Sequence, residues 1–262
     1  MKVGIVGIGV VGNACKFGFE LLGHQVSVHD IKFNTTIDNV IDTSVIFICV
    51  PTPSREDGSC DICIVEEIIK DLKDRDYKGV IAIKSTVLPG TTENLISETG
   101  LNICFVPEFL RERCAVTDFT EQHDVCIIGT ADTETFEIIK ECHGNYPEQF
   151  VQLTPTESEF CKYFNNVYNA MLIIFANSFY ELCKKTNVNY TNVKNAIIKR
   201  KHINSNYLEC NDYFRGFGGV CLPKDTAAMA MLAKETNVKF FENLLEENSK
   251  YKITVFEGMR KK

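Results

Sequence analysis

The chain opens with Lys2-Val3-Gly4-Ile5-Val6-Gly7-Ile8-Gly9-Val10-Val11-Gly12, an apolar run that ends in the spacing GxGxxG. The apolar run predicts a buried strand, and the helical pattern that continues to about Leu22 predicts a helix directly after the glycines. In such a unit Gly7 permits the tight turn, Gly9 leaves space for a pyrophosphate, and Gly12 lets helix and strand pack closely. The stretch therefore predicts the first βα unit of a dinucleotide-binding fold.

A second predicted strand, residues 25–29, ends at Asp30. A carboxylate about 20 residues after the glycines accepts hydrogen bonds from a ribose diol and repels a 2′-phosphate. The sequence therefore predicts NAD, rather than NADP, as the cofactor. The basic neighbours His29 and Lys32 are the residues that argue against this preference.

Further strand and helix patterns alternate along the first half of the chain. Predicted strands lie at residues 44–50, 79–83, 102–106 and 124–129, and predicted helices at 65–72, 91–98 and 134–142. This alternation predicts an α/β fold in which residues 1–153 form a Rossmann-type parallel sheet. Ligands bind beyond the carboxyl ends of such strands. The segments that follow those ends are Pro51-Thr52-Pro53, Ser85-Thr86 and Pro107-Glu108-Phe109-Leu110-Arg111-Glu112.

The strand patterns then stop, and residues 154–262 are predicted to form an all-helical domain. Residues 156–185 carry apolar side chains at helical spacing, and Thr156 with Glu159 matches a capping box. A helix of this length extends about 45 Å, more than a small domain needs. We therefore expect a homodimer contact along residues 156–186. Shorter helices are predicted at residues 192–199, 225–235 and 240–250.

Composition and charge exclude several classes of function. The 262 residues are 45% hydrophobic and 24% charged with a net charge of -7, which is ordinary for a soluble protein and argues against nucleic-acid and anionic-membrane partners. No apolar run reaches the length of a membrane span, and no signal peptide is expected. The twelve cysteines are scattered singly, which indicates a reducing, cytoplasmic location. Cys60-x-x-Cys63 lacks a second pair and lies in a predicted loop, so we expect no metal site.

A second glycine-rich stretch, Gly216-Phe217-Gly218-Gly219-Val220-Cys221-Leu222-Pro223-Lys224-Asp225, precedes a predicted helix. Proline is favoured in the first turn, so we expect the helix to begin at about Pro223. Cys221 would then lie beside the positive helix end and near Lys224, which lowers a thiol pKa and favours the nucleophilic thiolate. Taken alone, these residues favour a structural interpretation, with a glycine turn, a buried cysteine and an acidic residue at a helix start.

Several motifs occur in the order found in one known enzyme family. They are the GxGxxG turn, Ser85-Thr86-Val87-Leu88-Pro89-Gly90-Thr91-Thr92, Pro107 to Glu112, Lys162-x-x-x-Asn166 and Gly216 to Asp225. On these motifs the chain resembles the nucleotide-sugar dehydrogenases of the UDP-glucose/GDP-mannose dehydrogenase family over essentially its whole length. The resemblance implies oxidation of the primary alcohol of a nucleotide sugar, most closely UDP-glucose, to a carboxylate by two NAD in succession.

The resemblance also implies a role for each catalytic residue. Cys221 captures the aldehyde as a thiohemiacetal, which a second hydride transfer converts to a thioester. Asp225 and Lys162 hold or relay the proton, while Lys162 and Asn166 donate to the developing oxyanion. The residues implied to position the hydrolytic water are Glu108, Thr86 and Asp225.

The same resemblance divides the remaining site residues between cofactor and substrate. The predicted cofactor-binding residues are Gly7, Gly9, Val10, Val11, Gly12, Asp30, Thr52, Ser85, Thr86, Glu112 and Lys224. The predicted substrate-binding residues are Glu108, Phe109, Leu110, Lys162, Asn166, Arg215, Gly216, Phe217, Gly218 and Gly219.

Two departures from the family pattern bear on the substrate. Family members usually carry a third, C-terminal domain for the nucleotide, whereas this chain ends at Lys262 and resembles a short form without it. We expect weak substrate binding unless another chain supplies that half or the substrate is smaller. Ser205 stands where the family has an arginine that reaches a neighbouring active site, and Arg215 is the candidate to replace it.

Two other functions fit parts of the sequence. A β-hydroxyacid dehydrogenase also joins a Rossmann domain to a helical domain, and would use Lys162 without needing Cys221. A non-catalytic NAD-binding partner of a complete dehydrogenase would fit the absent third domain. Two NADH formed per sugar would support the nucleotide-sugar dehydrogenase, and one would support the β-hydroxyacid dehydrogenase. NAD binding with no sugar binding and no turnover would support the non-catalytic partner.

Overall fold

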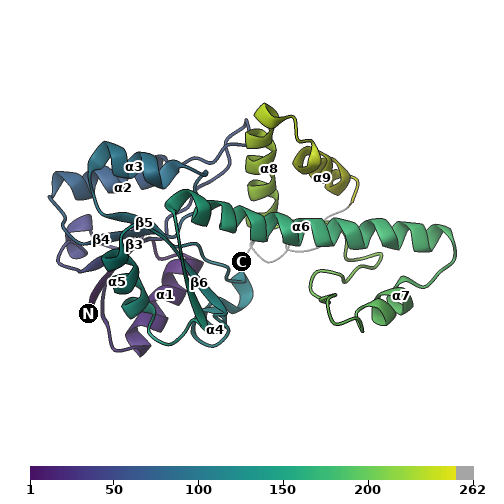
Figure 1. The fold of residues 1–262 in the computed structure, drawn as a ribbon, viewed down its shortest axis with the longest axis horizontal. Coiled ribbons are helices and arrows are strands. Elements are labelled where there is room, and N and C mark those ends of the chain that lie inside the picture. The colour runs from purple at the N-terminus through teal and green to yellow at the C-terminus, as the bar shows by residue number, and fades with distance from the viewer. Residues whose placement is uncertain (252–262) are drawn as a thin grey trace. The chain divides into compact units, whose positions relative to one another are not determined.

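The computed structural model describes residues 1–251, which divide into two compact units (Figure 1). Unit 1 comprises Met1–Pro53 and Cys60–Lys162, and unit 2 comprises Ser54–Ser59 and the chain from Tyr163 onward. The division falls inside a long helix, whereas the sequence-based boundary at residues 153 and 154 falls just before that helix. The short segment Ser54–Ser59 belongs to unit 2 although its neighbours on both sides belong to unit 1.

Unit 1 is built on one seven-stranded sheet with the strand order β2-β1-β3-β4-β5-β6-β7. The strands are β1 (Lys2–Val6), β2 (Gln25–His29), β3 (Val45–Ile48), β4 (Val80–Ile83), β5 (Ile103–Phe105), β6 (Val125–Gly129) and β7 (Gln149–Leu153). All neighbours are parallel except β5 and β6, which pair antiparallel at Phe105 and Gly129. The predicted α/β fold with a Rossmann-type sheet is confirmed.

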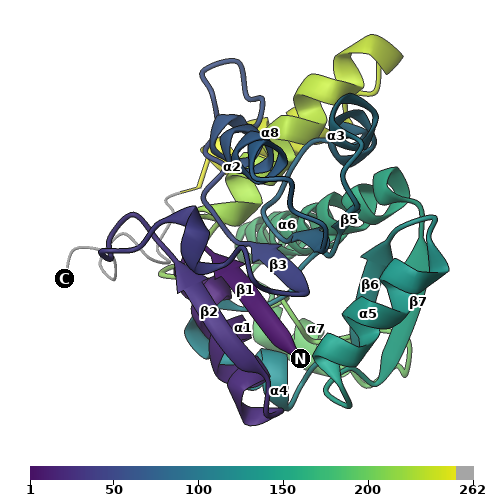
Figure 2. The same cartoon turned by 90° about the vertical axis from the view of Figure 1, so that its left-hand side faces the viewer.

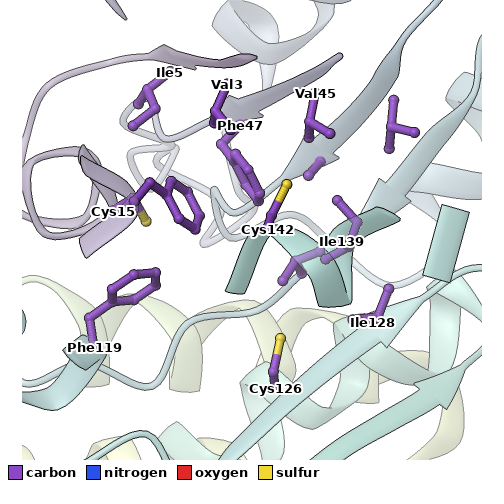
Figure 3. Packing of buried hydrophobic residues seen from close by; sticks show 14 of the residues in the cluster. Val3, Ile5, Cys15, Val45, Phe47, Phe119, Cys126, Ile128, Ile139 and Cys142 are labelled. Carbon is purple, nitrogen blue, oxygen red and sulfur yellow. The ribbon is translucent and has the colours of Figure 1, made fainter. Parts of the chain in front are cut away.

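Helices cover both faces of this sheet (Figure 2). They are α1 (Val10–Leu21), α2 (Cys63–Asp74), α3 (Thr91–Thr99), α4 (Ala115–Thr120) and α5 (Thr133–His143), with short 3-10 turns at Ile37–Asn39 and Glu112–Cys114. Successive side chains of a strand point to opposite faces, so Val45 and Phe47 of β3 pack toward α1, α4 and α5 while Ile46 and Ile48 pack toward α2 and α3. Figure 3 shows Phe47 directed toward Cys142 of α5. This two-sided burial explains the nearly unbroken apolar runs of the central strands.

Strand β7 was not predicted from the sequence. Its residues Gln149–Leu153 alternate polar and apolar side chains and remain largely exposed because β7 is the edge strand. A short, half-polar run of this kind gives a weak strand signal, and its parallel pairing with β6 becomes evident only in the folded chain.

A buried histidine occupies the core on the α5 side of the sheet. The His143 ring is fully buried and lies 5.4 to 5.7 Å, between centroids, from Phe19, Phe47 and Phe119. Its Nδ1 lies 2.8 Å from a carbonyl oxygen one turn earlier in α5. Burial, and then the nearby charge of Lys84, holds the pKa of His143 well below 6.5. The ring is therefore neutral in the folded protein at neutral pH.

We expect this histidine to make the fold sensitive to mild acid. Below pH 6.5 an unfolded histidine binds a proton that the folded His143 does not, so stability present above that pH is lost as the pH falls. The loss is about 2 kcal/mol per histidine between pH 7 and pH 5. Urea unfolding at both pH values should show a smaller loss for His143→Phe than for the wild type. The exposed-site control His202→Gln should keep the wild-type loss, and an unchanged loss in His143→Phe would contradict the assignment.

Unit 2 is helical, as predicted for the second half of the chain. Its helices are the main part of α6 (Pro155–Lys185), α7 (Tyr190–Ile197), α8 (Cys221–Ala233) and α9 (Phe240–Ser249), with a 3-10 turn at Lys234–Thr236. A separate small core forms around Ala176, Cys183, Tyr190, Leu208 and Cys210. Among residues 1–251, no helix combines the length and the hydrophobicity needed to cross a bilayer.

Two helix starts differ from the prediction. Helix α8 begins at Cys221, two residues before Pro223. Proline is tolerated as the third residue of the helix because the first four N–H groups of a helix have no hydrogen-bond partner within it. The capping box of α6 is Thr154 with Glu157, whose side chains and backbone N–H groups hydrogen-bond each other at 2.8 to 3.3 Å. The predicted box of Thr156 and Glu159 is wrong, because Pro155 begins the helix and places Thr156 inside its first turn.

Candidate active site

The glycine turn after β1 has the shape that a dinucleotide requires. Gly7 has φ +90, and a Cβ there would lie 2.8 Å from the carbonyl oxygen of Cys49. A Cβ on Gly12 would lie 2.0 Å from the carbonyl oxygen of Gly7, so this glycine is needed for the helix to approach the turn. Gly9, the N-cap of α1, has open space where its Cβ would be. The turn therefore leaves room for a phosphate at the uncapped N–H groups of α1.

The acidic residue at the end of β2 is held against the same turn. Asp30 Oδ2 accepts a hydrogen bond from the N–H of Ile8 at 2.6 Å, and Oδ1 accepts one from the N–H of Lys32 at 2.8 Å. These bonds, that from Lys32 first, lower the pKa of Asp30, so the carboxylate is anionic. A carboxylate fixed beside the glycine turn fits the role predicted for it toward a ribose diol.

A pair of glycine substitutions separates folding from cofactor binding. We expect Gly12→Ala to lower the free energy of unfolding by roughly 3 kcal/mol, because the new methyl group overlaps a backbone carbonyl. Gly9→Ala should change the free energy of unfolding by less than about 1 kcal/mol, because its Cβ meets open space. It should nevertheless raise the Kd for NAD at least about tenfold, because the methyl group fills the space for the phosphate. Thermal unfolding and calorimetric NAD titration measure both effects. Wild-type NAD affinity in Gly9→Ala would contradict this site.

The loops after β3 and β4 are joined by buried polar contacts. Ser85 is buried, and its Oγ donates to the carbonyl oxygen of Val50 at 2.8 Å. The Sγ of Cys60 lies 3.2 Å from the carbonyl oxygen of Thr86 and 3.7 Å from that of Thr52. Cys60 thus links two loops that carry predicted cofactor residues. Cys63, the other cysteine of the CxxC motif, is the first residue of α2, so the expectation that the motif lies wholly in a loop is wrong.

Glu159 was missed as a residue that organises this region. It is buried and accepts hydrogen bonds from the N–H of Gly90 at 2.6 Å and from the N–H and Oγ1 of Thr92 at 2.8 and 2.6 Å. Burial raises its pKa in spite of these three bonds. Glu159 therefore caps α3 from α6 and fixes the loop that contains Thr86. Gly90, the N-cap of α3, has no side chain to cap the helix, and this was the only signal in the sequence.

The segment after β5 brings two predicted catalytic residues together. Lys162 and Glu108 form an ion pair with Nζ and Oε1 3.1 Å apart, and both side chains are largely buried. Lys162 also donates to the backbone carbonyl of Glu108, and Glu108 Oε2 accepts from the N–H of Leu110 at 2.8 Å. The Lys162 Nζ lies 5.8 Å from the centre of the Phe109 ring. Glu112, a predicted cofactor residue, lies further along and is exposed.

A second group of predicted residues lies in unit 2, at the start of α8. Cys221 is its first residue and is exposed. Asp225, one turn later, is completely buried, and its Oδ2 accepts from Nδ2 of Asn166 at 2.5 Å. Its Oδ1 lies 2.7 Å from Nζ of Lys224 but has no hydrogen-bond partner among residues 1–251. A buried carboxylate oxygen of this kind fits a site that binds a hydroxyl group or a water.

The predicted site residues fall into two groups, one within each unit. Unit 1 contains the glycine turn with Asp30, the linked loops of Thr52 and Thr86, and the pair of Glu108 and Lys162. Unit 2 contains Cys221, Asp225, Lys224 and Asn166, preceded by the glycine loop, in which the Phe217 side chain is buried. Lys162 and Asn166 lie one turn apart on α6, so one continuous helix carries a member of each part.

Comparison with known proteins identifies the family. Family models match residues 27–146 as the NAD binding domain, and residues 156–250 as the central domain, of the UDP-glucose/GDP-mannose dehydrogenase family. UDP-glucose 6-dehydrogenase AglM of Haloferax volcanii is 30% identical over an alignment of 288 positions, gaps included, that covers 89% of this chain and 66% of that protein. GDP-mannose 6-dehydrogenase of Pseudomonas aeruginosa is 26% identical over an alignment of 301 positions, gaps included, that covers 95% of this chain and 68% of that protein.

A solved structure gives the same result. The UDP-glucose dehydrogenase of Pyrobaculum islandicum matches with a TM-score of 0.86 at 28% identity, over 95% of this chain and 68% of that one. The chain therefore spans about two thirds of the length of these relatives. The family predicted from the sequence motifs is confirmed. The chain belongs to the UDP-glucose/GDP-mannose dehydrogenase family and contains its NAD-binding domain and its central domain.

Proposed function

We propose that the chain oxidises the primary alcohol of a nucleotide sugar, UDP-glucose in the first instance, to the uronic acid through a covalent intermediate on Cys221. The observation that carries this proposal is the start of α8. An exposed cysteine at the helix end precedes by one turn a buried carboxylate, Asp225, whose Oδ1 is ion-paired with Lys224 at 2.7 Å and makes no hydrogen bond among the described residues. A nucleophile and a proton-handling group at this spacing suit acyl chemistry.

The residues of unit 1 fit NAD as the cofactor. The open space at Gly9 and the N–H groups of Val10 and Val11 accommodate its pyrophosphate, and the Asp30 carboxylate beside them suits its ribose diol. Thr52, Thr86, Glu112 and Lys224 are proposed to complete the cofactor site. When bound, NAD accepts hydride from the sugar carbon in each of the two oxidations.

The side chains of this protein have three tasks in the two proposed oxidation steps. Asp225 and Lys162 relay the hydroxyl proton through water during the first oxidation. Cys221 adds its sulfur to the resulting aldehyde, and the second oxidation turns this thiohemiacetal into a thioester. Lys162 and Asn166 donate hydrogen bonds to the oxyanion that forms at each addition.

Hydrolysis then completes the reaction. Water positioned by Glu108, Thr86 and Asp225 attacks the thioester carbon and releases the Cys221 thiol. One alcohol, one water and two NAD therefore yield one carboxylic acid, two NADH and two protons. A simple alcohol dehydrogenase removes only two electrons from its substrate. It would therefore form one NADH and leave an aldehyde or a ketone.

The test is a panel of nucleotide sugars, free sugar alcohols and free β-hydroxyacids, scored for the NADH formed per substrate molecule consumed. Two NADH per UDP-glucose, or per another nucleotide sugar, supports the proposal. One NADH from a free β-hydroxyacid substrate supports the alternative that uses Lys162 alone. Calorimetric binding of NAD without sugar binding or turnover on any substrate supports the alternative of a non-catalytic partner.

We also propose that a second copy of this chain covers an apolar stripe on α6. The stripe consists of Phe164, Tyr168, Phe175, Phe179 and Leu182, all exposed. At 100° per residue these side chains fall within an arc of about 60° on one helix face. Light scattering should give twice the 29.6 kDa chain mass, and Phe175→Glu with Phe179→Glu should give the monomer. A wild-type monomer would overturn the proposal.

The buried cysteines of unit 1 fit the cytoplasmic location that we propose.

A further inference from the structure

One side chain of α9 binds both backbone groups of a residue in the glycine loop before Cys221. Asn248 is 7% exposed, and its Oδ1 accepts a hydrogen bond from the N–H of Phe217 at 2.7 Å. Its Nδ2 donates to the carbonyl oxygen of the same residue at 2.9 Å. An asparagine amide offers the donor and the acceptor of a peptide group, so Asn248 pairs with Phe217 as a neighbouring strand would.

The conformation of Gly216 shows how closely Asn248 approaches the loop. Gly216 has φ +67, and a Cβ there would lie 2.8 Å from Oδ1 of Asn248 and 3.3 Å from Cβ of Tyr251. Both the backbone conformation and the short distance to Asn248 make any side chain at this position strained. The glycine is therefore required by the contact with Asn248, independently of any ligand.

A second asparagine fixes the loop from α6. Asn177 is 1% exposed, and its Oδ1 accepts from the N–H of Gly216 at 3.2 Å and from Nε of Arg215 at 2.7 Å. The Arg215 guanidinium contacts the rings of Tyr180 and Tyr251, with its Cζ 4.9 and 4.7 Å from their centres. Residues 215–217 are thus fixed by two helices, and only the short link 218–220 separates them from Cys221.

We infer that Asn248 is a positioning residue for the reaction at Cys221. A glycine-rich loop has many accessible backbone conformations, and two buried hydrogen bonds to one peptide unit select one of them. Asn248 sets the path of the loop, and the loop in turn sets where the sugar carbon lies relative to the sulfur. This inference rests on the proposed function and adds to it a residue that no motif in the sequence indicated.

The test compares the same substitution at two positions of α9. Asn248→Ala removes both bonds to Phe217, whereas Asn243→Ala changes an exposed residue of the same helix. We expect Asn248→Ala to lower kcat for the sugar by about 10- to 100-fold, because displacements of about 1 Å have effects of that size. The Kd for NAD should stay within about twofold, since the cofactor residues of unit 1 are untouched. Asn243→Ala should match the wild type in both quantities.

A chemical readout makes the test independent of turnover. The rate at which iodoacetamide alkylates Cys221, followed by mass spectrometry of its peptide, should change at least about threefold in Asn248→Ala, because the link 218–220 flanks the thiol. If Asn248→Ala does not fold, Gly216→Ala presses on the same amide from the loop side and should give the same change. Wild-type kcat and alkylation rate in a folded Asn248→Ala protein would overturn the inference.

Failure of the proposed function gives a different pattern. The wild type would then turn over no nucleotide sugar, yet the alkylation rates would still decide whether Asn248 controls the surroundings of Cys221. Equal rates in wild type, Asn248→Ala and Gly216→Ala would reject the positioning role. If Cys221 is alkylated at an altered rate in both variants, the positioning role of Asn248 stands, whatever reaction Cys221 performs.

Discussion

Cys221→Ser should stop the reaction at the aldehyde and reduce the NADH formed per sugar from two to one. The hydroxyl of serine is a far weaker nucleophile than a thiolate, so no thioester forms and no carboxylate is released. We expect uronic acid formation to fall at least about 1,000-fold, as nucleophile substitutions in other enzymes do. Product analysis together with NADH absorbance measures both quantities.

A matched control tests whether the position of the cysteine matters. Cys63 is also exposed and also begins a helix, α2, but it lies outside the predicted catalytic group. Cys63→Ser should therefore retain two NADH per sugar at the wild-type rate. If Cys221→Ser still forms two NADH per sugar, the covalent role of this cysteine is refuted and the β-hydroxyacid alternative gains support.

Asp225→Asn should reduce both turnover and stability. The buried carboxylate accepts from Asn166 and pairs with Lys224, so an amide leaves the lysine, only 11% exposed, without its counter-charge. We expect a loss of about 3 to 5 kcal/mol in the free energy of unfolding, typical of a broken buried pair. Loss of a proton-relaying group should also lower kcat by about 100- to 10,000-fold.

The exposed pair of Asp212 and Lys184 provides the control for this prediction. Its atoms are 2.6 Å apart, but both side chains are more than half exposed. Asp212→Asn should therefore change stability by less than about 1 kcal/mol and leave kcat unchanged. Urea unfolding and steady-state kinetics of the two variants make the comparison. Wild-type kcat in Asp225→Asn would exclude this carboxylate from the reaction.

Local sequence signals predicted the parts of the site that depend on local structure. Residue spacing predicts the GxGxxG turn, Asp30 after β2 and the long helix that carries Lys162 and Asn166. Such features are predictable because turns and helices are formed by residues close together in the sequence. The family motifs supplied the roles of Cys221 and Asp225, which spacing alone did not distinguish from a structural cysteine at a helix start.

Contacts between distant segments were not predictable in this way. Glu159 caps α3 across 67 residues, and Asn248 binds Phe217 across 31 residues. Each was an ordinary polar residue in a helical pattern, and Glu159 was assigned to a capping box of its own helix. Edge strand β7 escaped prediction for the same reason, since its pairing with β6 depends on the fold rather than on its own residues.

The most direct test of covalent catalysis by Cys221 is to detect the sugar attached to its sulfur. Turnover of UDP-glucose with NAD is quenched in acid at successive times, and the peptide that contains Cys221 is weighed by mass spectrometry. We expect a peptide that carries the uronyl group as a thioester, which hydroxylamine removes. Uronic acid accumulating with two NADH per sugar, while Cys221 remains unmodified at every time, would contradict it.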